Sequence, residues 1–405
     1  MAIKYLKTST LKNKTVLLRV DVNVPIENGK VSDAFRIEQV VPTIKHLLKN
    51  KNKVIVCGHL GRPKGKWNEE FSLKPAAKLM ADFLELKFIE TDHRVPDYHA
   101  RHLIFYTGKI TEDKHQKQIK AISEKDIVFL ENLRFYKGEE ENDPVFSKKL
   151  SNLADVYVND AFGVDHRSAA SIVGVTKYLN SYCGLLLEKE IKSLDALIRH
   201  PKSPFVVMTG GIKLSEKVGA LENLGKKADK ILVSGGVANL IFQTKGFEIG
   251  ISRVEEGERK TAMQIAKNYK NKLVLPVDVV VANKELKNIR SCAPYEVREN
   301  EQILDAGPKT ILEFSKHIKA AKTIVWSGPL GLFEKKPFHH ATFALARLIG
   351  GRGKGKAFVV AGGGDTVDAI RQAHQFENID HVSTGGGAML EYLAGKKLPG
   401  IEALK

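Results

Sequence analysis

Short apolar runs alternate along the chain with stretches in which apolar residues recur at helical spacing. The runs lie at 16–20, 53–57, 127–130, 156–158, 205–208, 323–326 and 357–361. Their length and composition indicate buried strands, and residues 36–48 are typical of an amphipathic helix. Because strands that alternate with helices usually form parallel sheets, the pattern predicts an α/β fold. We expect two lobes, each a doubly wound parallel sheet flanked by helices.

Two glycine triplets near the end of the chain each stand between a strand pattern and a helix pattern. The six residues are Gly362, Gly363, Gly364, Gly385, Gly386 and Gly387. Glycines let a backbone approach a phosphate closely, and the N–H groups and positive dipole end of the following helix then point at it. A tight turn explains either triplet alone, but the repetition favours anion sites. Neither triplet has the P-loop pattern.

Two polar residues follow the first triplet directly. Asp365 can hold a magnesium ion, and Thr366 can donate a hydrogen bond to a phosphate oxygen. We therefore expect a phosphate and metal site at the end of the strand at 357–361.

Polar residues also gather where the strands of the first half end, which is where open parallel sheets bind ligands. The cationic candidates are Arg36, His59, Arg62, Arg134 and Arg167, and Asp21 and Asn23 can bind hydroxyl groups. Because a guanidinium pairs bidentately with carboxylate or phosphate, this basic cup predicts a small, multiply anionic substrate. A surface ion pair would explain any one of these arginines alone. It is a poor explanation for four arginines at strand ends or in the loop and helix start that follow.

In the second half, Gly210 and Gly211 follow the strand at 205–208 and precede Lys213 and Lys217. If that segment is helical, the two lysines share a face near its positive end and repel each other unless an anion lies between them. A solvated lysine face is the alternative interpretation.

Composition narrows the class of protein. The 405 residues fit two domains, and 43% apolar with 27% charged residues is ordinary for a soluble globular protein. No membrane segment or apolar signal core is visible, and the three cysteines (Cys57, Cys183 and Cys292) lie far apart. We therefore expect a cytoplasmic protein without disulfides or a membrane partner.

The formal net charge of +17 raises the question of nucleic-acid binding. The lysines are scattered along the chain, however, and no helix-turn-helix, zinc-finger or aromatic-interleaved basic motif accompanies them. We expect a solvated surface or an inward-facing anion site, with no dedicated nucleic-acid partner.

Four motifs at the strand ends, with His166-Arg167 after the last, make the sequence resemble the phosphoglycerate kinase family. They are Arg19-Val20-Asp21-Val22-Asn23-Val24-Pro25, His59-Leu60-Gly61-Arg62-Pro63, Leu130-Glu131-Asn132-Leu133-Arg134-Phe135 and Asn159-Asp160-Ala161-Phe162-Gly163. The similarity continues in the same order over essentially the full chain. It implies reversible phosphoryl transfer between 1,3-bisphosphoglycerate and ADP, giving 3-phosphoglycerate and ATP in glycolysis.

The resemblance also implies the organisation of the chain. Residues 1–178 would bind phosphoglycerate, 179–200 would form an interdomain helix about which the lobes move, and 201–394 would bind the nucleotide. Residues 395–405 would return to the first domain, so that the termini lie together. A monomer is expected.

Roles for the site residues follow from the same resemblance. Arg36 and Lys213 would stabilise the transferring group together with the backbone N–H groups of both glycine triplets. Lys217 and Thr366 would hold nucleotide phosphates, and Asp365 would bind Mg²⁺. Of the remaining residues implied for the nucleotide, Gly210 and Gly211 would stand at the phosphates and Gly235 and Gly236 beside the purine. Pro329 would pack on the nucleotide, and Glu334 would accept the ribose hydroxyls. The cup would bind the glycerate.

One position departs from the family pattern, since Ser327 stands where the family usually has asparagine. Two other functions also stay open. A kinase for a different small carboxylate would keep the second-half motifs with a different cup, and a non-catalytic basic binding protein could use the same fold.

Overall fold

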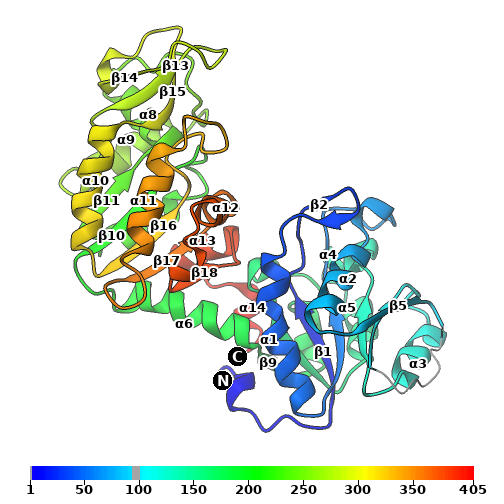
Figure 1. The fold of residues 1–405 in the computed structure, drawn as a ribbon. Coiled ribbons are helices and arrows are strands. Elements are labelled where there is room, and N and C mark those ends of the chain that lie inside the picture. The colour runs from blue at the N-terminus through cyan, green and yellow to red at the C-terminus, as the bar shows by residue number, and fades with distance from the viewer. Residues whose placement is uncertain (1, 94–100) are drawn as a thin grey trace. The chain divides into compact units, whose positions relative to one another are not determined.

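The computed structural model describes residues 2–93 and 101–405, and the chain divides into two compact units (Figure 1). Unit 1 comprises Met1–Ile191 together with Lys397–Lys405, and unit 2 comprises Lys192–Lys396. The division falls inside helix α6 (Leu185–Arg199), so this helix contributes residues to both units.

Unit 1 is built on a parallel sheet to which the described residues contribute seven strands. Their order is β5 (Lys87–Thr91), β6 (His102–Tyr106), β7 (Ile127–Leu130), β4 (Lys53–Cys57), β1 (Thr15–Val20), β8 (Val156–Asp160) and β9 (Asn180–Cys183). Leu17 of the central strand β1 lies opposite Ile55 of β4 and Tyr157 of β8. All residues of β4, β6, β7 and β8 are buried, as expected for a parallel sheet covered on both faces. The four strands predicted in this half are confirmed.

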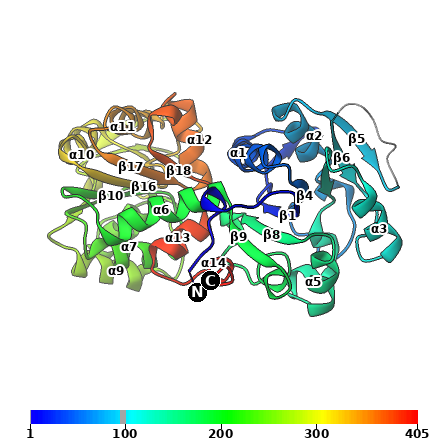
Figure 2. The same ribbon diagram turned by 90° about the horizontal axis from the view of Figure 1, so that it is seen from below.

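Helices cover both faces of this sheet (Figure 2). On one face α1 (Phe35–Lys49) packs against α2 (Lys74–Phe83), and the other face carries α3 (Asp113–Ala121) and α5 (Pro144–Ser151). The strands that follow β1 are added on both of its sides, so the sheet is doubly wound as predicted. A short hairpin that the sequence analysis did not anticipate, β2 (Ile26–Glu27) with β3 (Lys30–Val31), precedes α1.

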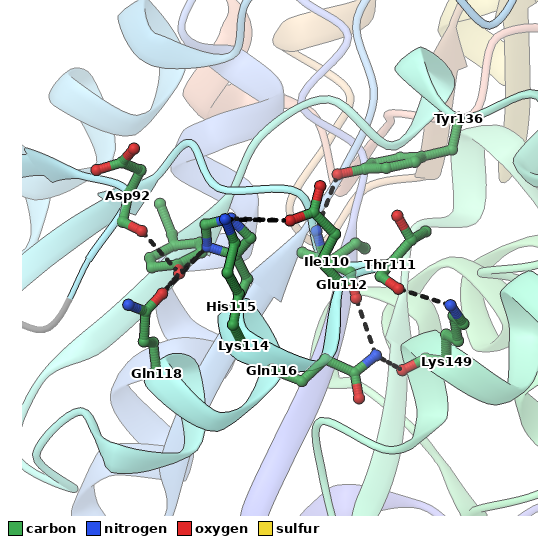
Figure 3. A network of polar contacts seen from close by, with 11 residues as sticks. Asp92, Ile110, Thr111, Glu112, Lys114, His115, Gln116, Gln118, Tyr136 and Lys149 are labelled. Atoms are coloured by element: carbon green, nitrogen blue, oxygen red, sulfur yellow. Dashed lines mark hydrogen bonds and ion pairs between the residues drawn. The ribbon is translucent and has the colours of Figure 1, made fainter.

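Polar contacts attach α3 to its neighbours, as Figure 3 shows. The buried Gln116 side-chain amide donates to the carbonyl oxygens of Ile110 and Lys149 at 2.9 and 3.1 Å. The Lys149 ammonium donates to the Thr111 carbonyl at 2.6 Å, and the Ile110 N–H donates to the Tyr136 hydroxyl at 3.1 Å. Gln116 therefore joins the loop before α3 to the end of α5.

Unit 2 is built on a second parallel sheet, with six strands in the part of the chain that is described. Their order is β12 (Leu273–Val274), β11 (Lys230–Val233), β10 (Phe205–Thr209), β16 (Thr323–Ser327), β17 (Phe358–Gly362) and β18 (His381–Ser383). The winding proceeds from β10 towards β12 and then, on the other side, from β16 towards β18. This second doubly wound sheet confirms the predicted fold class.

Helices α10 (Pro308–Ala320), α11 (His340–Gly350) and α12 (Gly364–Gln372) pack in sequence on one face of this sheet (Figure 2). Helices α7 (Val218–Gly225) and α13 (Gly387–Leu393) pack against each other, as do α8 (Gly235–Thr244) and α9 (Arg259–Asn268). Unit 2 also contains an antiparallel sheet that the sequence analysis missed. Its order is β14 (Arg290–Cys292), β13 (Val279–Ala282) and β15 (Gln302–Ala306).

The last residues of the chain belong to unit 1. Leu398, Ile401 and Leu404 are buried, and helix α14 (Pro399–Glu402) brings the Gly400 N–H to the Asp165 carbonyl at 2.9 Å. A side chain at Gly400 would collide with the Asp165 carboxylate. The beginning and the end of the chain lie side by side within this unit (Figures 1 and 2).

The three cysteines are buried and free, in agreement with the expectation of no disulfide framework. Within residues 2–93 and 101–405, no helix has both the length and the apolar character that crossing a membrane requires.

Candidate active site

The first glycine triplet joins β17 to α12, and its three glycines differ in their surroundings. A side chain on Gly362 would collide with the Met389 sulfur of α13. Gly363 caps α12 with φ at 102°, a conformation that residues with a side chain rarely adopt. Gly364 begins the helix and has open space where a side chain would stand. Close approach of a ligand is therefore possible at Gly364, while Gly362 serves packing.

The second triplet joins β18 to α13 in a similar way. Gly385 donates its N–H to the Ser383 hydroxyl at 3.1 Å, which closes the turn. Gly386 has φ at 50° and, like Gly387, faces open space. Two helix starts in unit 2 thus present N–H groups that are not covered by side chains.

A cavity of about 1090 Å³ lies at the carboxyl ends of β10, β11, β16 and β17. Strands β10 and β16 are neighbours from which the sheet is wound in opposite directions, and such a switch point is where open α/β sheets bind ligands. Of the residues predicted to bind the nucleotide, the cavity is lined by Gly211, Lys213, Lys217, Gly235, Gly236, Pro329, Glu334 and Asp365.

Glycines bring the walls of this cavity together by backbone contacts. The Gly211 N–H donates to the Pro329 carbonyl at 2.9 Å, and the Gly210 N–H donates to the Ser327 carbonyl at 3.1 Å. A side chain at Gly210 would collide with Pro329, and one at Gly235 would lie 2.9 Å from the Gly211 nitrogen. Gly210 therefore serves the close contact between the ends of β10 and β16.

The two lysines do not share a helical face, so that premise was wrong. Helix α7 begins at Val218, and residues 214–217 form a turn that leads into it. The exposed Lys213 ammonium donates to Glu216 at 2.8 Å, and Lys217 donates to the Lys213 carbonyl at 3.2 Å. Glu216 thus neutralises Lys213, and the half-buried Lys217 lies over the loop, where burial lowers the pKa of its ammonium.

Asp365 and Thr366 differ in their exposure. Asp365 is exposed in the first turn of α12, where its charge acts on both Lys213 and Lys217. Thr366 is buried, and its hydroxyl accepts a hydrogen bond from the Gly328 N–H at 2.7 Å. Its side chain therefore braces the loop after β16.

No group of three or more His, Cys, Asp or Glu residues suited to a metal occurs in the described ranges. Asp365 lines the cavity together with the carboxylates of Glu216, Asp305 and Glu334, and Mg²⁺ is commonly held by one or two carboxylates together with substrate phosphates. The donor set fits a magnesium ion that arrives with a nucleotide.

Asp305 also lines the cavity. It is buried and accepts hydrogen bonds from the N–H groups of Ala341 and Ala306 at 3.0 and 2.9 Å, and burial raises its pKa to about 7. The nearby Asp278 caps α10 by accepting from the N–H groups of Thr310 and Lys309 at 2.7 and 3.0 Å. Both carboxylates thus accept hydrogen bonds from the first residues of a helix.

In unit 1, the basic cup forms around His59 at the carboxyl end of β4. His59 is buried, and its pKa lies well below the usual value, first because of burial and then because of the charges of Arg19, Arg134, Arg36 and Arg167. Three of the four predicted arginines therefore act on one imidazole. Arg62 follows in the same loop and is exposed.

Backbone carbonyls at the strand ends orient the guanidinium groups. Arg36 donates to the Asn23 carbonyl at 2.5 Å and lies 3.6 Å from the buried Asp21 carboxylate. Arg134 donates to the Gly61 carbonyl at 2.6 Å, and the Gly61 N–H donates to the Asn23 side chain at 3.0 Å. Asp21 and Asn23 thus hold the arginines and the neighbouring loop in place.

Sequence reasoning missed Arg19 as a separate member of the site. Its side chain is 2% exposed and lies within hydrogen-bond distance of His59. An arginine inside an otherwise apolar strand was the available signal, because charged residues are rarely buried without a partner.

Two doubly wound parallel sheets, with glycine-lined helix starts in one unit and a cationic cup in the other, define an α/β phosphotransferase. The family model described as "Phosphoglycerate kinase" matches residues 6–396. The chain belongs to the phosphoglycerate kinase family.

Similar proteins extend over nearly the whole chain. The phosphoglycerate kinase of Finegoldia magna is 41% identical over 99% of this chain and 98% of its own length, and that of Thermosipho africanus is 42% identical over 97% and 96%. The solved structure of phosphoglycerate kinase from Coxiella burnetii covers 100% of this chain and 99% of its own at 36% identity, with a TM-score of 0.82. The Pyrococcus horikoshii structure gives 0.83 at 30% identity and covers 99% and 98%.

The chain is thus a transferase (EC 2.7.2.3) of glycolysis, and it catalyses reversible phosphoryl transfer between 1,3-bisphosphoglycerate and ADP, with 3-phosphoglycerate and ATP as products. The family generally uses a magnesium nucleotide. A non-catalytic binding protein is not favoured.

Proposed function

We propose that the basic cup of unit 1 binds the phosphoglycerate and that the cavity of unit 2 binds the magnesium nucleotide. The single observation that carries this division is the convergence of arginine charges on the buried His59. Cations brought together in this way repel one another unless an anion lies among them. A small substrate with a carboxylate and a phosphate supplies such charges.

Within the cup, we assign Arg62, Arg134 and Arg167 to the charged groups of the glycerate. Guanidinium groups suit this role because their planar forks bind carboxylate and phosphate bidentately. Asp21 and Asn23 are near Arg36 and can take a substrate hydroxyl, and His59 adds a further polar contact. The cup would thus recognise both the negative charges of the glycerate and the position of its hydroxyl group.

In unit 2, we assign Gly235, Gly236 and Pro329 to the purine side of the cavity and Glu334 to the ribose hydroxyls. Lys217 and the N–H groups at the start of α12 bind the nucleotide phosphates. Thr366 supports this arrangement through its hydrogen bond to Gly328. Asp365 would hold Mg²⁺, which supplies charge neutralisation on the phosphates.

Arg36 and Lys213 are the cations that we assign to the transferring phosphoryl group, with the N–H groups of the two glycine triplets as further donors. Phosphoryl transfer passes through a loose transition state whose charge spreads over the equatorial oxygens, so positioned cations and dipoles are the main catalytic groups. Lys213 is paired with Glu216, and phosphate oxygens would have to replace that carboxylate. No covalent enzyme intermediate is required.

The test is Arg36→Ala, measured as 3-phosphoglycerate-dependent ADP formation from Mg-ATP with a coupling enzyme that consumes 1,3-bisphosphoglycerate. We expect kcat to fall about 10²- to 10³-fold, because one electrostatic group at the reacting centre contributes on that scale. The Kd for Mg-ADP should stay within about twofold of the original value.

Arg101→Ala is the matched control, because Arg101 is exposed and stands at the start of β6, at the opposite end of the strands. It should change neither kcat nor the Michaelis constants. A normal kcat for Arg36→Ala would contradict the assigned role. Equal loss of Mg-ADP binding and of kcat would contradict the division of the substrates between the units.

A further inference from the structure

Arg19 lies beside His59 and is linked by hydrogen bonds to the Glu139 carboxylate through the Ser171 hydroxyl. Its Nε donates to the Ser171 hydroxyl at 2.7 Å, and that hydroxyl donates to Glu139 Oε1 at 2.5 Å. The Ser171 N–H donates to the other Glu139 oxygen at 3.0 Å. All three residues are at most 2% exposed, so the guanidinium is held in one orientation and its charge is compensated.

The other end of the guanidinium reaches His59. Arg19 Nη2 lies 3.2 Å from His59 Nδ1, and a guanidinium can only donate hydrogen bonds. His59 Nδ1 must therefore be the acceptor. A neutral imidazole carries one ring hydrogen, so this contact assigns the hydrogen to Nε2.

The groups that face His59 and Arg19 come from several elements. Arg36 of α1, Arg134 of the turn at Leu133–Phe135 and Arg167 act on His59 together with Arg19, and these charges and burial both lower its pKa. The other titratable groups near Arg19 are Cys57, Glu139, Tyr157 and Asp165. The guanidinium interacts electrostatically with Cys57, Tyr157 and Asp165, and it is linked to Glu139 through Ser171. A second ring proton would add a cation among four others and would place a hydrogen at Nδ1 against the guanidinium.

We propose that Arg19 is a positioning residue, which fixes His59 as the neutral imidazole with its hydrogen on Nε2, so that His59 donates a hydrogen bond to an anionic oxygen of the substrate. Within residues 2–93 and 101–405, no protein group accepts from Nε2, so this hydrogen remains available. The other tautomer would direct a lone pair at an anion. The inference rests on the proposed role of the cup as the glycerate site.

The tautomer can be measured directly in the unmodified protein by ¹⁵N NMR of labelled histidines, with His59→Gln to assign the signals. Between pH 5.5 and 8.5 without substrate, we expect an unprotonated Nδ1 and a protonated Nε2. A protonated Nδ1, alone or with Nε2, would overturn the assignment. Added 3-phosphoglycerate should then shift Nε2, and a normal tautomer without this response would instead contradict the role of the cup.

A kinetic test uses Ser171→Ala, with the exposed neighbour Ser168→Ala as the control. Loss of the hydroxyl frees Arg19, so we expect KM for 3-phosphoglycerate to rise about tenfold, the scale of one charged hydrogen bond, with kcat within about twofold. KM should also gain a dependence on pH that the original protein lacks, falling in acid as the released His59 gains its second proton.

A merely structural role for Ser171 would lower the melting temperature without creating this ionisation in the KM profile. If folded Ser171→Ala keeps the original KM and pH profile, the positioning role of Arg19 is overturned. If the variant does not fold, the NMR measurement on the unmodified protein decides the question.

Discussion

At the scale of single residues, the three glycines between β17 and α12 differ in function although they are adjacent. Gly362 is fixed by packing against Met389, Gly363 by its backbone angle, and Gly364 by neither. Only Gly364 therefore keeps open space that a ligand can use. This difference allows stability and binding to be tested separately.

Gly363→Ala should lower the free energy of unfolding by about 1 to 3 kcal/mol, because alanine is strained at φ 102°. Gly364→Ala should leave stability within about 0.5 kcal/mol and raise KM for Mg-ATP, because its methyl group occupies the space needed by a phosphate. Urea unfolding and initial rates measure the two effects. A Gly364→Ala enzyme with unchanged KM would show that no phosphate approaches there.

The sequence predicted which residue types surround the site but not how their side chains are paired. Lys213 is bonded to Glu216, and Thr366 supports Gly328 from inside the protein. Arg19 is bonded to a serine 152 residues away. The last two pairs are brought together by the fold and leave no periodicity in the sequence, so pattern reasoning could not find them.

At the scale of elements, strands with continuous apolar runs were predictable because burial on both faces imposes that composition. The turn at 214–217 was not predictable, because two lysines four residues apart suit a solvated helix equally well. The antiparallel sheet of β13, β14 and β15 was also missed. Its strands are short, and β14 begins with the arginine of the Arg290–Glu301 ion pair, so its sequence lacks an apolar run.

The attachment of α3 gives a prediction about one element. Gln116→Met keeps the size of the side chain but removes the two hydrogen bonds to the Ile110 and Lys149 carbonyls (Figure 3). Unpaired buried carbonyls are costly, so we expect about 2 kcal/mol of destabilisation, measured by the urea midpoint.

Gln39→Met on α1 is the control, because this half-buried glutamine makes no side-chain hydrogen bond to the described protein. Similar midpoints for the two variants would contradict the role of Gln116. Gln116→Met should leave the Michaelis constants unchanged, since the Gln116 side chain donates to the Ile110 and Lys149 carbonyls and to no residue of the cup or the cavity.

At the scale of the whole molecule, the winding of each sheet was predictable from the alternation of strands and helices, and with it the edges at which ligands bind. The partners of the buried carboxyl groups in unit 1 were not predictable from the sequence. In the sequence, Asp160 is only a polar residue after the apolar run at 156–158, yet its carboxylate accepts a hydrogen bond from the Leu187 N–H at the start of α6 at 3.1 Å. Asp165 lies against Gly400 of the tail.

These two groups make global stability depend on pH. Burial raises the pKa of Asp160 to about 7 and that of Asp165 to about 8. The folded state thus binds their protons more tightly than the unfolded state does. The resulting stabilisation is complete below the ordinary pKa of 3.8 and is lost as pH rises through about 7 to 8.

We therefore expect the free energy of unfolding to fall between pH 5 and pH 9, by on the order of 3 kcal/mol for each carboxyl group. Asp165→Asn cannot ionise and keeps the oxygen that accepts from Asn159, so its decline should be shallower. Chemical unfolding at each pH measures this, with the exposed Asp82→Asn as control. Parallel curves for Asp165→Asn and the original protein would contradict the prediction.

The tail has a consequence for the order in which the protein is made. The strands of unit 1 are synthesised before residue 184, yet Leu398, Ile401 and Leu404 fill part of its interior. The ribosome must therefore translate all of unit 2 before the last piece of unit 1 exists. The unit whose synthesis starts first is completed last, and a nascent chain halted anywhere before residue 397 carries it unfinished.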